Sequence, residues 1–221
     1  MKKGFTLAEV LLTLAIVGVV ASLTVPAIVN HSSNKKFVTA LEKVNFTMNA
    51  ALKRAIVTNG PVREWTKTSV TADFEKYFLP YLDLNRNCGT GTGCFSDNYK
   101  ILRSTGSDCV PGLDADTKYY KVIMADGISL AFSPPASYNN ATGDSGTIYV
   151  DINGLEGPNL CGRDLFRFAL YSYTNNIKAY GIYGAYDATR KNRILNSSFD
   201  CSASNADGCG ARIFTEGGMK Y

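Results

Sequence analysis

The chain has 221 residues, of which 45% are hydrophobic and 19% are charged, and its formal net charge at pH 7 is +4. These proportions exclude a collagen-like, a low-complexity and a wholly disordered chain, and also a multi-span membrane protein. The small net charge is far from the basic excess of a dedicated nucleic-acid-binding protein.

The first feature along the chain is an apolar segment at residues 5–29, in which 18 of the 25 residues are hydrophobic. No residue between Glu9 and Lys35 is charged. As a helix, the segment would span about 37 Å, which is enough to cross a hydrocarbon core of about 30 Å. Lys2 and Lys3 precede it and favour a cytoplasmic N-terminus, so we expect the rest of the chain to face outward.

Glu9 lies within this apolar segment, where an acidic side chain costs about 2.5–3.5 kcal/mol at the bilayer centre. An ordinary secretory signal peptide, cut near Ala21 or Ala27, would explain the apolar residues but not the charge. An ionisable residue in a membrane segment indicates a functional site with a partner. The signal peptide stays the alternative interpretation.

Residues 4–9 read GFTLAE, and an unbroken apolar stretch follows them. This run resembles the processing and assembly signature of type IV prepilins and type II secretion pseudopilins. The resemblance implies that a prepilin peptidase cuts between Gly4 and Phe5 and that Phe5 is then N-methylated. It also implies that Glu9, a charge stranded in lipid, pairs with the N-terminal amine of a neighbouring subunit when subunits stack. Pro26 matches a helix-kinking proline of the family.

The same resemblance implies the partners and the location of the protein. The partners would be other pilin or pseudopilin subunits, the prepilin peptidase, the inner-membrane assembly platform, and membrane lipid before assembly. The chain would be a single-pass cytoplasmic-membrane protein with an extracytoplasmic domain, and after assembly it would form a periplasmic or cell-surface filament.

An amphipathic stripe continues the predicted helix beyond the apolar segment. Its members recur at helical spacing and are Phe37, Leu41, Val44, Met48, Leu52 and Ile56. Asn59, Gly60 and Pro61 end the helix, because glycine favours the position after a helix and proline cannot continue one. We therefore expect a leader at residues 1–4, a membrane or filament-core helix at 5–29, its amphipathic continuation at 30–58, and a globular domain at 59–221.

Within that domain the sequence predicts an α+β fold, a long helix packed on a small antiparallel sheet. A second helix is predicted from Thr71, a possible N-cap, to Leu82, and Pro80 is expected to kink or shorten it. Four to five strands follow, the first two joined by the hairpin turn Asp126-Gly127. The candidate strands are residues 118–125, 128–133, 146–152, 164–171 and 177–183.

All six cysteines lie beyond the apolar segment, which fits export into an oxidising compartment and disulfide formation. Six cysteines allow 15 pairings. Proximity in sequence favours Cys88–Cys94 and Cys201–Cys209, which leaves Cys109–Cys161. The glycine-rich run between Cys88 and Cys94 matches neither common phosphate-binding spacing, so we expect a disulfide-closed loop there.

The stretch from Thr147 to Phe166 resembles a DxNGxxGPNxxGxD pattern of bacterial pilin-like domains. It holds oxygen-bearing side chains that suit a hard cation, which makes calcium a weak candidate. These residues are Asp151, Asn153, Glu156, Asn159 and Asp164. The EF-hand spacing fails, and Asx turns between strands explain the same residues without a metal.

The chain shows little support for catalysis or for DNA binding, and we expect no cofactor apart from that weak calcium candidate. Its only histidine, His31, follows the apolar segment and is remote from any candidate cleft. Arg190, Lys191 and Arg193 could contact DNA, but three such charges are more typical of a solvated face.

The sequence therefore predicts a structural filament subunit rather than an enzyme. The alternative is a secreted or membrane-anchored surface-binding domain, such as an adhesin or carbohydrate-recognition domain. Whether the filament is a pilus, a secretion pseudopilus or a DNA-uptake filament stays open.

Overall fold

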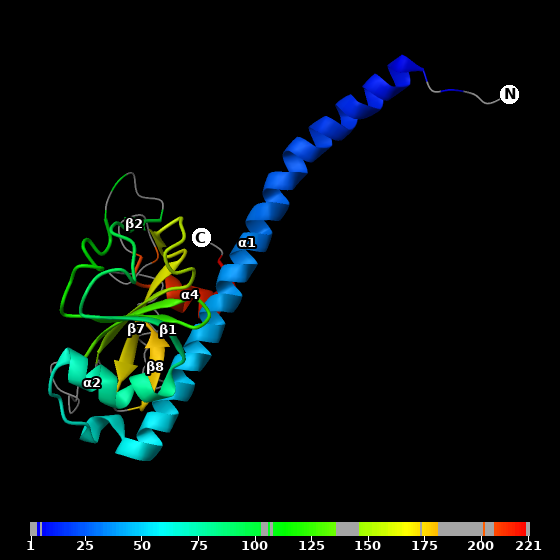
Figure 1. Ribbon diagram of the computed structural model, residues 1–221. Helices are drawn as coiled ribbons and strands as arrows, with labels where there is room; N and C mark the ends of the chain where they lie inside the picture. Colours follow the sequence, from blue (N-terminus) through cyan, green and yellow to red (C-terminus); the bar gives the residue numbers. More distant parts are fainter. Residues whose placement is uncertain are drawn as a thin grey trace. The chain divides into compact units, whose positions relative to one another are not determined.

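The computed structural model describes residues 4, 6–102, 106, 108–135, 146–172, 174–180, 201 and 206–219, and the backbone alone of residues 27 and 29–31. The chain divides into two units, residues 1–36 and 37–221. One helix, α1 (Leu7–Asn59), supplies nearly all of the described part of the first unit and begins the second (Figure 1).

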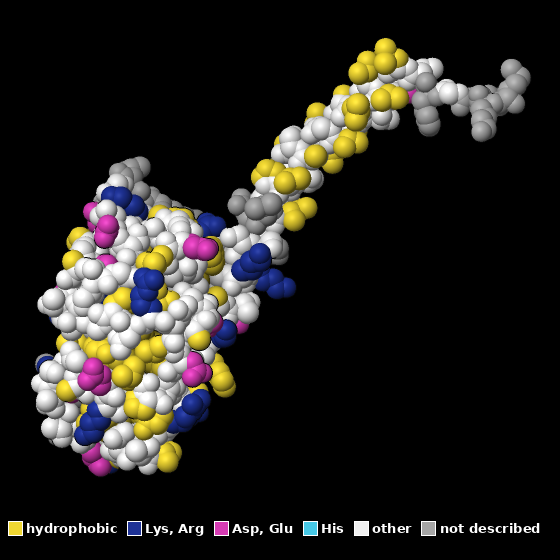
Figure 2. All heavy atoms as spheres, in the orientation of Figure 1, with side chains coloured by type: hydrophobic (Ala, Val, Ile, Leu, Met, Phe, Trp, Pro, Cys, Tyr) yellow, Lys and Arg dark blue, Asp and Glu magenta, His cyan; other side chains and the backbone are white. Residues whose placement is uncertain are grey.

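The first part of α1 is apolar and buries almost nothing within the chain. Among the described residues, Leu7–Pro26 is the one helical segment that is long and apolar enough to cross a membrane, and none of it is buried. Figure 2 shows hydrophobic side chains along this segment. Leu7 and Leu23 are 79% and 72% exposed. Pro26 lies inside the helix, where its missing N–H removes one backbone hydrogen bond.

The second part of α1 carries the expected amphipathic stripe. Leu41, Val44, Met48 and Leu52 are buried in the core of the domain, and Phe37 and Ile56 pack against it. The helix ends at Asn59, where Gly60 takes a positive φ of 78° and donates its N–H to the carbonyl of Ile56. The stripe and the helix end are both confirmed.

After a short 3-10 turn, η1 (Val62–Glu64), the second helix is shorter than predicted. Helix α2 spans Val70–Tyr77, and Pro80 belongs to a separate 3-10 turn, η2 (Leu79–Tyr81). The predicted N-cap Thr71 is wrong, because extended Ser69 accepts the N–H of Ala72 in its place.

Helix α2 packs on the sheet through stacked aromatic rings. Phe74 stacks on Tyr120 with ring centroids 4.5 Å apart, and Phe78 contacts Phe132 at 4.9 Å. Phe74 of the helix and Phe78, which follows its last residue, are both buried, and Tyr120 and Phe132 come from the first predicted hairpin. The helix therefore fixes one end of the core, where Figure 1 shows it.

The described strands form one sheet in the order β1-β3-β4-β5-β7-β6-β2, with β8 also paired to β7. All pairs are antiparallel except β2 with β6 and β6 with β7. The strands are β1 (Leu84–Gly89), β2 (Lys100–Ile101), β3 (Tyr120–Met124), β4 (Ser129–Ser133), β5 (Thr147–Asp151), β6 (Leu160–Cys161), β7 (Leu165–Tyr171) and β8 (Asn176–Ala179).

The α+β class is confirmed, but the sheet is larger than the four to five strands predicted. The hairpin at Asp126-Gly127 joins β3 and β4 as expected. Strand β1 was missed because it is mostly polar and half-exposed, and β2 and β6 have two residues each, too few for a periodic pattern. The last predicted strand, residues 177–183, corresponds to β8, which ends at Ala179; residues 181–183 lie outside the described residues.

Two further features fix the domain around β7 and β8. The short helix α4 (Cys209–Glu216), which the sequence did not reveal, packs on β7 through Phe214 and Phe168. Asn49 of α1 accepts the N–H of Ile177 and donates to its carbonyl, both at 2.9 Å. The outer edge of β8 is therefore partnered by a side chain of α1.

Candidate functional site

The start of α1 holds a reciprocal pair of hydrogen bonds between Thr6 and Glu9. The N–H and the hydroxyl of Thr6 each donate to Glu9 Oε2 at 2.8 Å, and the N–H of Glu9 donates to Thr6 Oγ1 at 3.3 Å. This is a capping box, in which the first residue and the one three places later satisfy each other's backbone donors. The Thr-x-x-Glu spacing was visible in the sequence, but it was not recognised there.

The capping box gives the Glu9 carboxylate hydrogen-bond partners within its own chain, which the sequence analysis did not expect. Its carboxylate is not stranded in the single chain, because Oε2 receives two hydrogen bonds and lies at the positive end of the helix. Among the described residues, only Oε2 takes part in these bonds, so Oε1 stays available for a donor from outside. Glu9 can therefore hold its position before a partner arrives.

The hydroxyl groups in the apolar span donate to the helix's own backbone. Thr13 donates to the carbonyl of Val10, and Ser22 donates to that of Val19. Thr24 makes the same kind of bond to Val20 at 2.9 Å. A polar group that bonds within its own helix can enter lipid at a smaller cost, so these residues do not prevent membrane insertion.

The predicted processing site is only partly described. Gly4 is exposed, and no described atom lies within 4 Å of the position where a side-chain carbon would be. Phe5 lies outside the described residues, as do the side chain of His31 and the basic residues Arg190, Lys191 and Arg193.

The five calcium candidates serve the loop between β5 and β7. Asp151 is fully buried; it accepts the hydroxyl of Tyr99 at 2.5 Å and the N–H of Asn153 at 3.1 Å, the second bond forming an Asx turn. Burial raises the pKa of Asp151 to about 7, although the bond from Tyr99 opposes the shift. Asp164, also fully buried, accepts backbone N–H groups of Asn159, Leu160 and Leu165.

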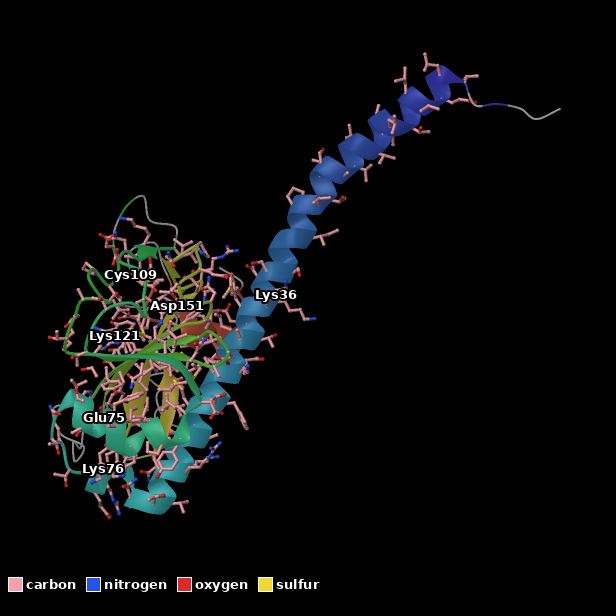
Figure 3. The ribbon with its side chains drawn as sticks, in the orientation of Figure 1. Lys36, Glu75, Lys76, Cys109, Lys121 and Asp151 are labelled. Carbon is pink, nitrogen blue, oxygen red and sulfur yellow. A yellow bond between two sulfur atoms is a disulfide. The ribbon has the colours of Figure 1, made fainter. Side chains whose placement is uncertain are left out.

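The remaining candidates close the same loop or face solvent. Asn153 donates to the carbonyls of Glu156 and Gly157, and Asn159 donates to Ser96 Oγ. Glu156 is exposed. In the described part of the chain, no group of three or more His, Cys, Asp or Glu residues could hold a metal ion. The arrangement supports the Asx-turn interpretation of the pattern, and Figure 3 labels Asp151 within the body of the domain.

The glycine-rich loop binds a carboxylate of its own chain. Asp114 accepts the backbone N–H groups of residues 93–95 at 2.7 to 3.0 Å. The buried Lys121 donates to the carbonyls of Thr90 and Asp116, and its burial lowers its pKa. The N–H groups of residues 93–95 therefore already donate to Asp114 and are not available to a phosphate. This agrees with the expectation of a closed loop rather than a phosphate-binding loop.

The structure joins the cysteines as Cys88–Cys94, Cys109–Cys161 and Cys201–Cys209, which coincides with the expected pairing. The first bond closes the glycine-rich loop, the second joins the segment after β2 to β6, and the third leads into α4. Disulfides of this kind suit a domain outside the cytoplasm.

Comparison with known proteins finds one match, to a motif at the N-terminus. Residues 1–25 match the prokaryotic N-terminal methylation motif. No curated protein and no solved structure matches the chain. The chain therefore carries a prepilin-type signal of the type IV pilin and pseudopilin kind at its N-terminus, where the capping box and the apolar helix also lie.

Proposed function

We propose that this chain is a structural subunit of a type IV pilus-like or type II secretion pseudopilus filament. The observation that carries the proposal is the methylation motif at residues 1–25, coupled to an apolar helix with no buried residue. In this account the prepilin peptidase cuts after Gly4, and Phe5 becomes the methylated N-terminal residue. The leader, the helix and the domain have the boundaries predicted above.

The apolar span needs a covering that its own chain does not supply. Its side chains are exposed in the single chain, so lipid surrounds them after insertion, with the N-terminus in the cytoplasm and the domain outside. On assembly, the spans of other subunits replace the lipid. The inner-membrane assembly platform is the partner that extracts each subunit.

Glu9 selects the partner in this mechanism. Oε2 is held by Thr6, so the carboxylate is oriented and can accept the N-terminal amine of a neighbouring subunit through Oε1. An ion pair in lipid is favourable only when both charges are present and close together. Stacking in the wrong register leaves both charges unpaired, which disfavours it.

Glu9→Gln tests this role and separates charge from capping. Glutamine keeps the oxygen that a capping box needs, but it cannot form an ion pair. We expect the variant to be processed and to remain in the membrane, with no filaments visible by electron microscopy of the native host. Glu42→Gln, an exposed site on the same helix, is the matched control and should assemble normally. Normal filaments from Glu9→Gln would remove the ion pair from the mechanism.

A further inference from the structure

A pair of lysines follows the apolar span on α1. Lys35 and Lys36 are the first charged residues after Glu9, and the next carboxylate along the chain is that of Glu42. Both lysine side chains are exposed. Figure 2 shows lysine or arginine side chains on α1 beyond the run of hydrophobic ones, and Figure 3 labels Lys36 there. No step of the filament mechanism uses these two charges.

The position of the pair along α1 matches the headgroup layer of a bilayer. At about 1.5 Å per residue, Lys35 and Lys36 lie about 9 and 10.5 Å beyond Val29, the last residue of the apolar segment. The headgroup layer is roughly 5–7 Å thick on each side of the hydrocarbon core, and a lysine side chain can bend several ångströms toward it. The segment of about 37 Å is longer than a core of about 30 Å, so tilting brings the lysines closer still. Both ammonium groups can therefore reach the phosphates of one leaflet.

The two charges have no counterion on their own stretch of the helix. Residues 10–41 include no Asp or Glu. The ammonium of Lys36 has no hydrogen-bond or ion-pair partner among the described residues. Ser32 is exposed one turn before Lys36 on the same helix face, so its hydroxyl can donate to the same phosphate. Two adjacent ammonium groups without a carboxylate attract a surface of net negative charge.

From the position and the charge of this pair we propose that Lys35 and Lys36 bind the headgroups of anionic phospholipids in the outer leaflet of the cytoplasmic membrane. Coulomb attraction selects a headgroup of net negative charge, such as phosphatidylglycerol, over the neutral phosphatidylcholine. The inference rests on the membrane insertion that the proposed function includes, but not on filament assembly. The bound lipids hold the subunit at its depth in the membrane and have to be released when it is extracted.

The test uses the full chain reconstituted into phosphatidylcholine vesicles that carry a trace of spin-labelled lipid. Electron paramagnetic resonance separates the lipids that contact the protein, whose motion is restricted, from the bulk lipid. We expect a restricted component with both labelled lipids, and an association constant for phosphatidylglycerol about threefold that for phosphatidylcholine. At about 1 M NaCl the Debye length falls to about 3 Å, so this preference should largely disappear.

Substitutions at the pair locate the source of the preference. The double variant Lys35→Gln/Lys36→Gln removes both charges and should lose most of the preference for phosphatidylglycerol, whereas Lys35→Arg/Lys36→Arg should keep it. The matched control is Lys53→Gln/Arg54→Gln, a second pair of adjacent exposed cations about 27 Å further along α1. This control lies beyond the reach of the headgroups and should keep the preference.

Lys2 and Lys3, before the apolar span, are present in every variant, so their contribution cancels in the comparison. The proposal is overturned if the inserted wild type does not prefer phosphatidylglycerol, if Lys35→Gln/Lys36→Gln keeps the full preference, or if the control loses as much. A restricted component that is absent with both labelled lipids would show that the span does not insert. That result would overturn the membrane stage of the proposed function together with this inference.

Discussion

The two units of the chain differ in whether their apolar side chains are buried within the chain itself. In the domain, apolar side chains meet each other in one core and buried charges meet partners, as Asp114 meets the N–H groups of residues 93–95. In the first unit, the polar groups of the helix are satisfied locally, but the apolar side chains of Leu7–Pro26 have no covering from their own chain. The domain can therefore be stable by itself, whereas the apolar span depends on lipid or on other subunits.

The largest expected difference between the two units is the effect of truncating one leucine in each of them on the free energy of unfolding. Leu52 is fully buried and Leu14 is 63% exposed, although both lie on α1. Leu52→Ala leaves a cavity in the core, so we expect the free energy of unfolding of the domain to fall by about 3 kcal/mol. Leu14→Ala should leave it unchanged. Urea unfolding of the full chain in detergent, followed by tryptophan fluorescence of Trp65, measures both. Equal losses of unfolding free energy in the two variants would contradict the claim that only the domain has a core of its own.

Protonation of Asp151 should give the domain a pH dependence that the apolar span lacks. The pKa of this carboxyl is about 7 in the folded chain and 3.8 as its ordinary value, so the folded state binds the proton more tightly. Its contribution to stability is then fully present below about pH 4 and is lost as the pH rises through about 7. Between about pH 4 and pH 7, stability should fall by about 1.4 kcal/mol for each pH unit.

The comparison of the wild type with Asp151→Asn isolates this contribution. Urea midpoints measured across the same pH range should fall more steeply for the wild type, because the variant has no carboxyl to titrate at this position. Asp97→Asn, at an exposed site, should follow the wild type. A variant that keeps the full slope would show that Asp151 is not its source.

The smallest expected effect concerns the start of α1. Thr6→Val removes the hydroxyl of the capping box, which should destabilise the first turn by about 1 kcal/mol. Hydrogen exchange of the amides of Ala8 and Glu9 in detergent should speed up about fivefold. Thr13→Val, which removes a hydroxyl bonded to a helix carbonyl, is the control and should leave these amides unchanged. Unchanged exchange in Thr6→Val would show that the cap does not hold Glu9.

The sequence was most informative where the determining residues lie close together along the chain. The amphipathic stripe from Phe37 to Ile56 and the turn at Asp126-Gly127 were both predictable from local patterns. The capping box is equally local, and its Thr-x-x-Glu spacing is a pattern from which the start of the helix can be predicted.

Side-chain hydrogen bonds and ion pairs between residues far apart in the sequence could not be predicted. Asn49 partners Ile177 across 128 residues, and Arg167 reaches Asp207 across 40. Nothing in the neighbourhood of either residue indicates its partner, since each contact depends on how the strands are ordered in the sheet. The role of Asp114 belongs to this class too, because it lies about 20 residues from the backbone N–H groups that donate to it.

The central claim is that the apolar segment is a prepilin signal that becomes a filament core. Mass spectrometry of the mature N-terminus, on protein from the native host, tests this claim most directly. The account predicts a chain that begins at an N-methylated Phe5. A chain that begins after Ala21 or Ala27 would contradict it and would identify the segment as an ordinary signal peptide.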